Sequence, residues 1–177
     1  GGIVAMIHRS FVGMMARYNR WQNGSLYAAA GGLDEAARRA ERGAFFGSIH
    51  GTLSHILWAD TMWMSRFWPE RVEKPGVGIK QSPELVSEWS ALCARRVAFD
   101  ELISEWAGVV ADDWLAGDLT WFSGAINQEV TRPTGLCVAH FFNHQTHHRG
   151  QVHAMLTAAG ARPEDTDIFL MPEETAS

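Results

Sequence analysis

The sequence reads His140-Phe-Phe-Asn-His144-Gln-Thr-His147-His148-Arg-Gly-Gln-Val-His153 near its C-terminal end, and this stretch holds five of the chain's eight histidines. On a helix each residue advances by about 100°, so His140, His144, His147 and His148 share one face and His153 does not. Residues three or four apart are close enough to hold one ion, and imidazole is the commonest protein ligand for zinc and similar metals. The stretch therefore predicts a metal site on one long helix.

A second interpretation of this stretch is that its histidines are core residues. A single histidine on an apolar face is usually a hydrogen-bonded residue of the core. Four on one stripe are harder to explain in this way, because each buried ring needs its own polar partners. The spacing favours the metal site.

Apolar residues recur at helical spacing in four long segments, and each segment has its own boundary signals. Ser82 and Pro83 predict the start of the third segment, as N-cap and first helical residue. Gly160, followed by Pro163, ends the fourth. We expect the four helices at about 5–31, 45–68, 82–110 and 134–160.

Between the third and fourth helices, two β-like pieces flank a turn that contains Gly124. They cover residues 119–122 and 128–131, and they predict a small hairpin. The segment 70–81 is expected to be irregular, because it contains Pro75, Gly76 and Gly78. The sequence therefore predicts an all-α fold in one domain, residues 1–177, as a four-helix bundle with a small β-hairpin or irregular insertion before the last long helix.

Composition excludes several classes of protein. The net charge of −5 leaves no basic surplus for a general nucleic-acid binder. No apolar run is long enough to cross a bilayer and no signal peptide is visible, so we expect no membrane partner and a cytoplasmic location. Cys93 and Cys137 are too few to suggest a disulfide framework.

Helix bundles build metal centres from side chains on facing helices, which directs attention to histidines outside the cluster. His55 is the best candidate, because it lies in the middle of the second helix beside its apolar stripe. His50 lies about 140° away on the helical wheel, and we expect it to cap the helix or face solvent. Trp58 and Trp63 are near His55 in the sequence; most of the eight tryptophans should fill the core, but one of these two is a candidate wall of a ligand pocket.

Four parts of the sequence together resemble the DinB family, over nearly the whole chain. They are Tyr18-Asn-Arg-Trp21-Gln-Asn23, the segment from Gly43 to Asp60 with its Ser48-Ile-His50-Gly-Thr-Leu-Ser-His55, the string His144-Gln-Thr-His147-His148-Arg149-Gly150-Gln151, and Asp165-Thr-Asp167-Ile-Phe-Leu. The resemblance implies an up-down-down-up bundle that binds one divalent metal ion through three histidines. Matched residue by residue, these are His55, His144 and His148. His140 and His147 do not fall on the ligand positions of the family.

The resemblance also implies an activity. Members with known chemistry are metal-dependent transferases that join a low-molecular-weight thiol to a small electrophile, with some isomerases and hydrolases. Three ligands with an open position are typical of a reactive centre. We therefore expect a metal-dependent thiol S-transferase, with zinc or nickel as the first choices of metal and iron, copper or manganese as others. The alternatives are a metal-binding stress protein without catalysis and a purely structural dimerising bundle.

Further residues have expected roles around this site. His147 and Asp60 are candidates for a base, or for hydrogen-bond acceptors of a ligating imidazole. Gln151 returns to the ligand face and is expected to orient a ligating ring. Arg149 points away from His148, and either a helix-pairing or surface contact or anion recognition would suit it.

The resemblance further suggests a homodimer. Met6, Val12, Leu26 and Tyr27 lie off the main apolar line of the first helix, and we expect them to form an exposed patch that pairs with a second copy. The alternative is that these four residues pack beneath the hairpin and the C-terminal segment.

Overall fold

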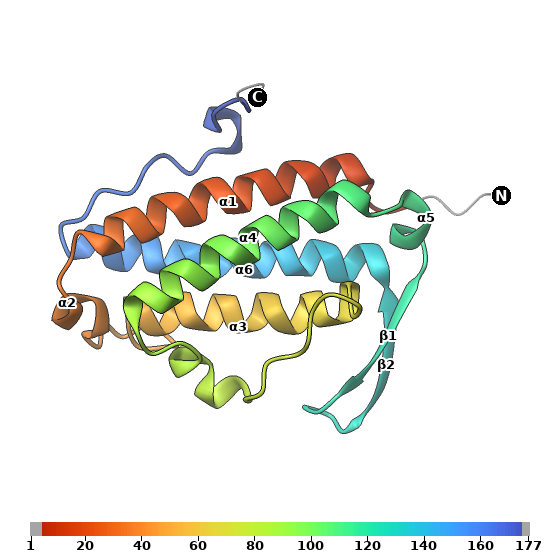
Figure 1. Ribbon diagram of the computed structural model, residues 1–177, viewed down its shortest axis with the longest axis horizontal. Helices are drawn as coiled ribbons and strands as arrows, with labels where there is room; N and C mark the ends of the chain where they lie inside the picture. Colours follow the sequence, from red (N-terminus) through yellow and green to blue (C-terminus); the bar gives the residue numbers. More distant parts are fainter. Residues whose placement is uncertain (1–4, 175–177) are drawn as a thin grey trace.

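The computed structural model describes residues 5–174, and within that range it contains four long helices and one hairpin. The long helices are α1 (Arg9–Gly31), α3 (Ile49–Phe67), α4 (Trp89–Val109) and α6 (Thr134–Ala158), and they lie side by side in Figure 1. α1 packs on α4 and α6, and α3 packs on α6. The mostly helical fold predicted from the sequence is confirmed.

The predicted hairpin is also confirmed, directly before the last long helix. β1 (Asp118–Ser123) and β2 (Gln128–Pro133) pair antiparallel, and Figure 1 shows them projecting from one end of the helices. The last helix ends as predicted, since Gly160 just beyond it has φ +86°. Four short elements were not predicted: the helices α2 (Glu35–Arg39) and α5 (Asp112–Leu115), and the 3₁₀ helices η1 (Ile79–Glu84) and η2 (Ile168–Leu170).

The starts of the first two long helices were predicted about four residues too early. The first begins at Arg9, and the second at Ile49. Ser48 caps the second helix, because its hydroxyl accepts a hydrogen bond from the Gly51 N–H at 2.9 Å. Gly47, at φ +83°, turns the chain just before this cap, so Phe45 and Phe46 lie outside the helix.

The predicted start of the third helix is wrong. Ser82 and Pro83 belong to η1, and α4 begins only at Trp89. The Ser82 hydroxyl is taken up by a contact with His55 and does not cap a helix. The carboxylate of Glu88 supplies the cap, accepting from the backbone N–H groups of Ser90 and Ala91.

The core has two apolar clusters, one toward each end of the bundle. One surrounds Phe67, Trp106 and Phe141, and the other surrounds Leu53 and Leu92. Along every long helix, buried polar residues separate the two clusters. Together they form a layer that we call the polar layer: Asn19 and Asn23 of α1, Asp60 of α3, Arg96 and Asp100 of α4, and Gln145 and Arg149 of α6.

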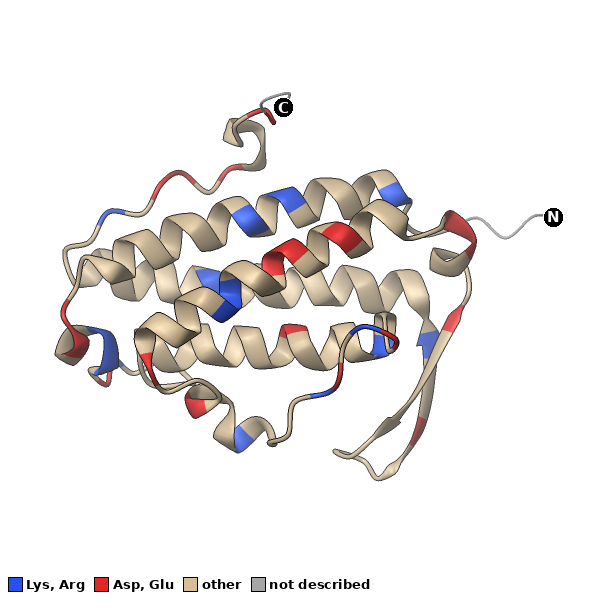
Figure 2. Ribbon diagram, in the orientation of Figure 1, with Lys and Arg blue, Asp and Glu red and all other residues tan. Residues whose placement is uncertain are grey.

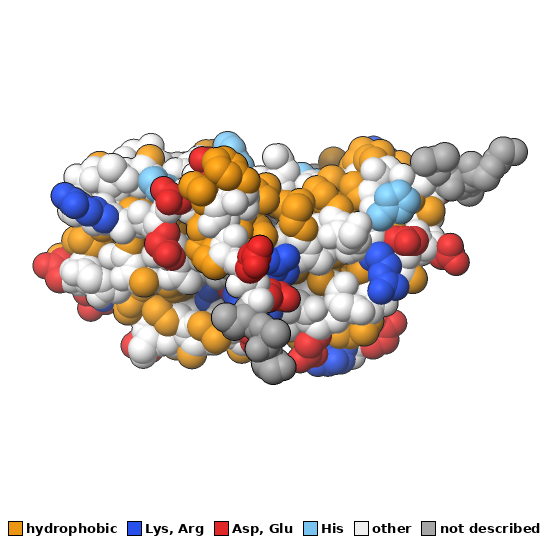
Figure 3. All heavy atoms as spheres, turned by 90° about the horizontal axis from the view of Figure 1, so that it is seen from above, with side chains coloured by type: hydrophobic (Ala, Val, Ile, Leu, Met, Phe, Trp, Pro, Cys, Tyr) orange, Lys and Arg blue, Asp and Glu red, His pale blue; other side chains and the backbone are white. Residues whose placement is uncertain are grey.

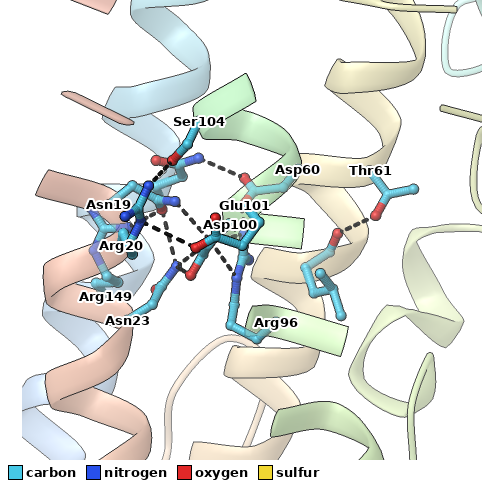
Figure 4. Close-up of polar contacts among 12 residues, drawn as sticks. Asn19, Arg20, Asn23, Asp60, Thr61, Arg96, Asp100, Glu101, Ser104 and Arg149 are labelled. Atoms are coloured by element: carbon cyan, nitrogen blue, oxygen red, sulfur yellow. Dashed lines mark hydrogen bonds and ion pairs between the residues drawn. The ribbon is translucent and has the colours of Figure 1, made fainter. Parts of the chain in front are cut away.

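Hydrogen bonds and ion pairs connect the polar layer across all four helices (Figure 4). Asp100 accepts from Asn19 at 2.9 Å, from Asn23 at 3.1 Å and from Arg96 at 2.7 Å. Arg96 also pairs with Asp60 at 2.9 Å. Two arginines and two aspartates balance in charge, which a buried layer requires.

Arg149 belongs to the same layer and is buried, so of its two expected roles the helix-pairing contact is the observed one. Its guanidinium donates to Asn19 Oδ1 of α1 at 2.8 Å. On the outside of the bundle, Arg20 donates a hydrogen bond to Ser104 and pairs with Glu101 of α4. Figure 2 shows that charged residues occur at positions along all the long helices.

The exposed patch predicted on the first helix is wrong for three of its four residues. Val12 and Leu26 are fully buried in the core, and Tyr27 is half-buried with its ring stacked on Trp89 at 5.5 Å. Met6 remains exposed. On the face shown in Figure 3, hydrophobic side chains are interspersed with charged ones.

No helix between residues 5 and 174 combines the length and the apolar character that a membrane span needs.

Candidate metal centre

Three imidazoles converge where α3 packs on α6. His55 comes from the middle of α3, and His144 and His148 lie one turn apart on α6. Each ring offers one nitrogen, and the three nitrogens all lie within 4.8 Å of one another. The Nε2 atoms of His55 and His144 are 3.4 Å apart. This spacing suits three ligands around a single ion.

His55 is the most enclosed of the three, with 2% of its surface exposed. The ring of Phe46 stacks on it at 3.6 Å between centroids. On the Nδ1 side, the hydroxyl oxygen of Ser82 lies at 2.8 Å. His55 is therefore fixed in position and orientation, with Nε2 turned toward the other two histidines.

His148 is oriented in the same way by Gln151, as the sequence predicted. The amide oxygen of Gln151 lies 2.7 Å from His148 Nδ1. A carbonyl oxygen can only accept, so Nδ1 carries the proton and Nε2 keeps its lone pair. A neutral ring held by a hydrogen bond on its far nitrogen is the arrangement found in metal-ligating histidines.

Burial also keeps these rings in the form that binds metal. It lowers the pKa of His55 to about 3, with the neighbouring rings of His148 and His144 contributing. For the same reasons, burial first and nearby imidazoles second, the pKa of His144 falls to about 4. The pKa of His148 is lowered by burial as well. The three imidazoles are thus neutral at pH 7 without any ion to hold off protons.

The remaining histidines of the α6 stretch have different surroundings. His140 and His147 face the same cavity as the cluster, and the His147 ring packs edge-on against His148 at 4.8 Å. Neither belongs to the three-nitrogen group. The expectation for His50 is wrong: it is buried, and its Nε2–H donates to the Val86 carbonyl at 2.8 Å, which ties α3 to the chain beyond η1.

The three nitrogens open onto a cavity of about 490 Å³. Both tryptophans singled out in the sequence, Trp58 and Trp63, line it. The other lining residues are mostly apolar or imidazole side chains: Phe45, Phe46, Ala59, Met62, Arg66, Ile79, His140, His147 and Gln151. A metal at the cluster would therefore have protein on one side and an accessible cavity on the other, which is the geometry of an open position.

The sequence reasoning missed Met62 and Arg66, although a signal for both was present. Ala59, Met62 and Arg66 follow His55 in steps of four, three and four residues. Such steps keep side chains on one face of a helix. Following the His55 face toward the end of α3 would have identified this wall of the cavity.

Asp60 does not lie at this site. Its carboxylate accepts from Gln145 at 3.1 Å and pairs with Arg96 at 2.9 Å, inside the polar layer. The sequence suggested Asp60 as a hydrogen-bond acceptor for a ligating imidazole. In the structure this position is taken by Ser82 beside His55 and by Gln151 beside His148. Burial raises the pKa of Asp60 to about 6 against the opposing effect of Arg96, so its altered pKa reflects the core and not the cavity.

Comparison with known proteins adds one finding. The family model described as "DinB family" matches residues 6–176, nearly the whole chain. Neither the curated proteins nor the solved structures gave a match.

Proposed function

The chain belongs to the DinB family, and from that premise we propose that it is a metal-dependent thiol S-transferase acting on a small electrophile. The observation that carries this proposal is the group formed by His55, His144 and His148, whose nitrogens lie within 4.8 Å of one another on the wall of a cavity. Imidazole-only coordination suits zinc or nickel first and iron or copper next, and manganese, which prefers oxygen ligands, is the last choice. A divalent ion held there supplies a Lewis acid that lowers the pKa of a thiol or a water molecule beside it.

The chain's own residues prepare the site in two ways. Ser82 and Gln151 fix two of the rings through Nδ1, so that Nε2 is presented. Phe46 and Trp58 shield His55 from bulk water by stacking on it. An apolar wall of this kind suits an apolar electrophile.

His147 is the base that we propose. Its ring lines the cavity beside His148 and is exposed to solvent, so it can accept a proton from a bound thiol and pass it to water. Asp60 is not proposed for this role, because its carboxylate is buried in the polar layer.

The experiment starts from protein purified without nickel resin. Elemental analysis of the wild-type chain should find one divalent ion per chain. His144→Ala and His148→Ala should lose it, and His153→Ala, on the same helix but outside the cluster, should keep it. The loaded protein should then consume cysteine in the presence of chlorodinitrobenzene, and the two ligand variants should not.

The outcomes separate the alternatives. Full metal content in His144→Ala overturns the ligand set. Metal binding without thiol consumption overturns the transferase and favours a metal-binding stress protein or a metal-dependent hydrolase or isomerase. If the protein binds no divalent ion, the remaining alternative is a purely structural bundle.

Two further features belong to this proposal. One is the up-down-down-up order of the long helices, supported by the packing of α1 on α4 and α6 and of α3 on α6. The other is a homodimer, to which the family premise points although the patch first expected on α1 is largely buried. Light scattering at micromolar concentration tests the dimer, and a mass near 19.6 kDa, that of one chain, would exclude it.

A further inference from the structure

Among the described residues that line the cavity, Arg66 is the only one with a permanent charge, and none carries a carboxylate. The three candidate ligands and the other two histidines of the cavity are imidazoles, and the rest of the lining is apolar apart from the Gln151 amide. In the described part of the chain, the cavity therefore has a single fixed positive charge on a largely aromatic wall.

Aromatic rings hold the Arg66 guanidinium in place. Its central carbon lies 4.5 Å from the Trp63 ring centroid on α3 and 5.1 Å from that of Trp121 on β1. The two indoles contact each other at 5.4 Å, so the hairpin closes on this end of α3. Within residues 5–174, no hydrogen bond or ion pair engages the Arg66 N–H groups, although the side chain is half-buried.

Two other arginines stack on tryptophan, and both have polar partners. Arg71 stacks on Trp68 at 4.7 Å and pairs with Glu105 at 3.0 Å. Arg38 stacks on Trp89 at 4.7 Å and donates to the carbonyls of Ala30 and Leu33. Stacking alone therefore does not account for Arg66, whose donors are left for a group that enters the cavity.

The chemistry of the guanidinium indicates which group that is. The contacts with the two indoles do not use its N–H groups, which form a planar fork that matches a carboxylate. A partly desolvated cation without a counter-charge favours an anion in the same cavity. The adjacent aromatic wall favours a flat apolar body attached to that anion.

We propose that Arg66 forms an anion subsite, and that the cavity takes an organic acid, a carboxylate or sulfonate on a flat apolar body. This inference rests on the proposed function in that it names the substrate class of the same site. Arg66 lies three helical turns beyond His55 on the same face of α3, so such a ligand would span the cavity with its anionic end away from the three histidines.

The test uses the full-length chain and two flat probes of nearly equal shape, naphthoate and its neutral amide, naphthamide. Titration calorimetry is run first on protein stripped of metal, where Arg66 is the only fixed charge lining the cavity. Naphthoate should bind about tenfold more tightly than naphthamide, the ratio that one charge-assisted bidentate contact provides. The preference should shrink as salt is raised.

Substitutions assign the preference to one side chain. Arg66→Gln should lower naphthoate affinity about tenfold and leave naphthamide within about twofold, and Arg66→Lys should fall between wild type and Arg66→Gln. Arg71→Gln is the matched control, a stacked arginine that is paired with Glu105 and outside the cavity lining, and it should bind both probes as wild type does.

Three results would overturn the subsite: equal affinities of wild type for the two probes, no binding of either, or a full preference for naphthoate in Arg66→Gln. The wild-type comparison stands on its own if Arg66→Gln does not fold. Because the first titration contains no metal, a failure of the metal centre does not alter it. If the wild-type protein binds zinc at the histidines but shows no preference for naphthoate, the anion subsite is wrong and the proposed function is unaffected.

Discussion

The hydroxyl oxygen of Ser82 lies 2.8 Å from Nδ1 of His55, a residue 27 positions earlier in the chain. This contact joins η1 to the middle of α3. Neighbouring bonds reinforce it, since the Ser54 hydroxyl donates to the Ser82 carbonyl at 2.7 Å and His50 binds the Val86 carbonyl. η1 therefore acts as a brace that holds the His55 ring with Nε2 toward α6.

Ser82→Ala should weaken metal binding without unfolding the protein. Losing a hydrogen-bond partner of a ligating histidine typically lowers metal affinity about 10–100-fold, and we expect the lower part of this range because Phe46 still holds the ring by stacking. Competition titration with a chromophoric chelator measures the change. Ser87→Ala, an exposed serine in the same connection, is the control and should bind metal like wild type.

An unchanged affinity in Ser82→Ala would show that stacking alone orients His55. An equal loss in both serine variants would point to a general loosening of the connection.

Gly51→Ala should disturb the packing of η1 against α3. A Cβ at position 51 would lie 2.7 Å from the Phe46 carbonyl oxygen and 3.3 Å from Pro83 Cβ, so both segments would have to move. We expect a loss of about 1–3 kcal/mol in unfolding free energy, together with weaker metal binding. Urea denaturation and the chelator titration measure the two effects.

Gly108→Ala is the matched control for this substitution. Gly108 is exposed in α4 with nothing within 4 Å of its Cβ position, so alanine should stabilise the helix by roughly 0.5–1 kcal/mol. A Gly51→Ala protein as stable as wild type would mean that η1 is not held closely against α3.

The contacts of this site could be predicted from the sequence where the residues are close together along the chain. The face of α6 with His144 and His148 follows from helical spacing alone, and Gln151 follows from the same geometry because it is three residues from His148. The hairpin was equally local, since turn residues separate two β-like pieces.

Contacts between distant segments were not predictable in this way. Ser82-Pro83-Glu84 carries every local signal of a helix start, yet tertiary contacts with α3 take its hydroxyl and restrict the helix to a short 3₁₀ turn. His50 was expected to cap the helix or face solvent because a helical wheel gives the direction of a side chain but not the segment that packs against it, here the segment with Val86. The polar layer likewise depends on four helices meeting at one level.

The pH dependence of stability should be set by the histidine cluster. Burial holds the pKa of His55 near 3 and that of His144 near 4, whereas both sit near 6.5 in the unfolded chain. Below about pH 6.5 the unfolded chain takes up protons that the folded protein refuses, so the metal-free protein should lose stability as pH falls from about 6.5 toward 4. Because protons compete poorly for the folded rings, metal release should begin well below pH 6.5, as the pH approaches 4.

Urea denaturation of metal-free protein between about pH 7 and pH 4 measures this slope, with His144→Gln as the comparison. The raised pKa of Asp60 acts in the opposite direction, but it is present in both proteins and cancels in the difference. The slope should be shallower in His144→Gln. Parallel curves for the two proteins would show that His144 is not held neutral by the fold.

The last prediction concerns the polar layer, where Arg96 neutralises two carboxylates at once (Figure 4). It pairs with Asp60 at 2.9 Å and with Asp100 at 2.7 Å, and all three side chains are buried. Arg96→Met keeps much of the side-chain volume but leaves two carboxylates in the core without their cation. Removing one member of a buried ion pair typically costs about 3–5 kcal/mol, so urea denaturation should show a loss of that size.

Arg95→Met, at an exposed position one residue earlier, is the control and should change the unfolding free energy by less than about 0.5 kcal/mol. Adding Asp60→Asn to Arg96→Met should recover part of the loss, because Asp100 and Arg149 then balance in charge within the layer. If Arg96→Met lowers the unfolding free energy no more than Arg95→Met does, the polar layer does not hold the helices together.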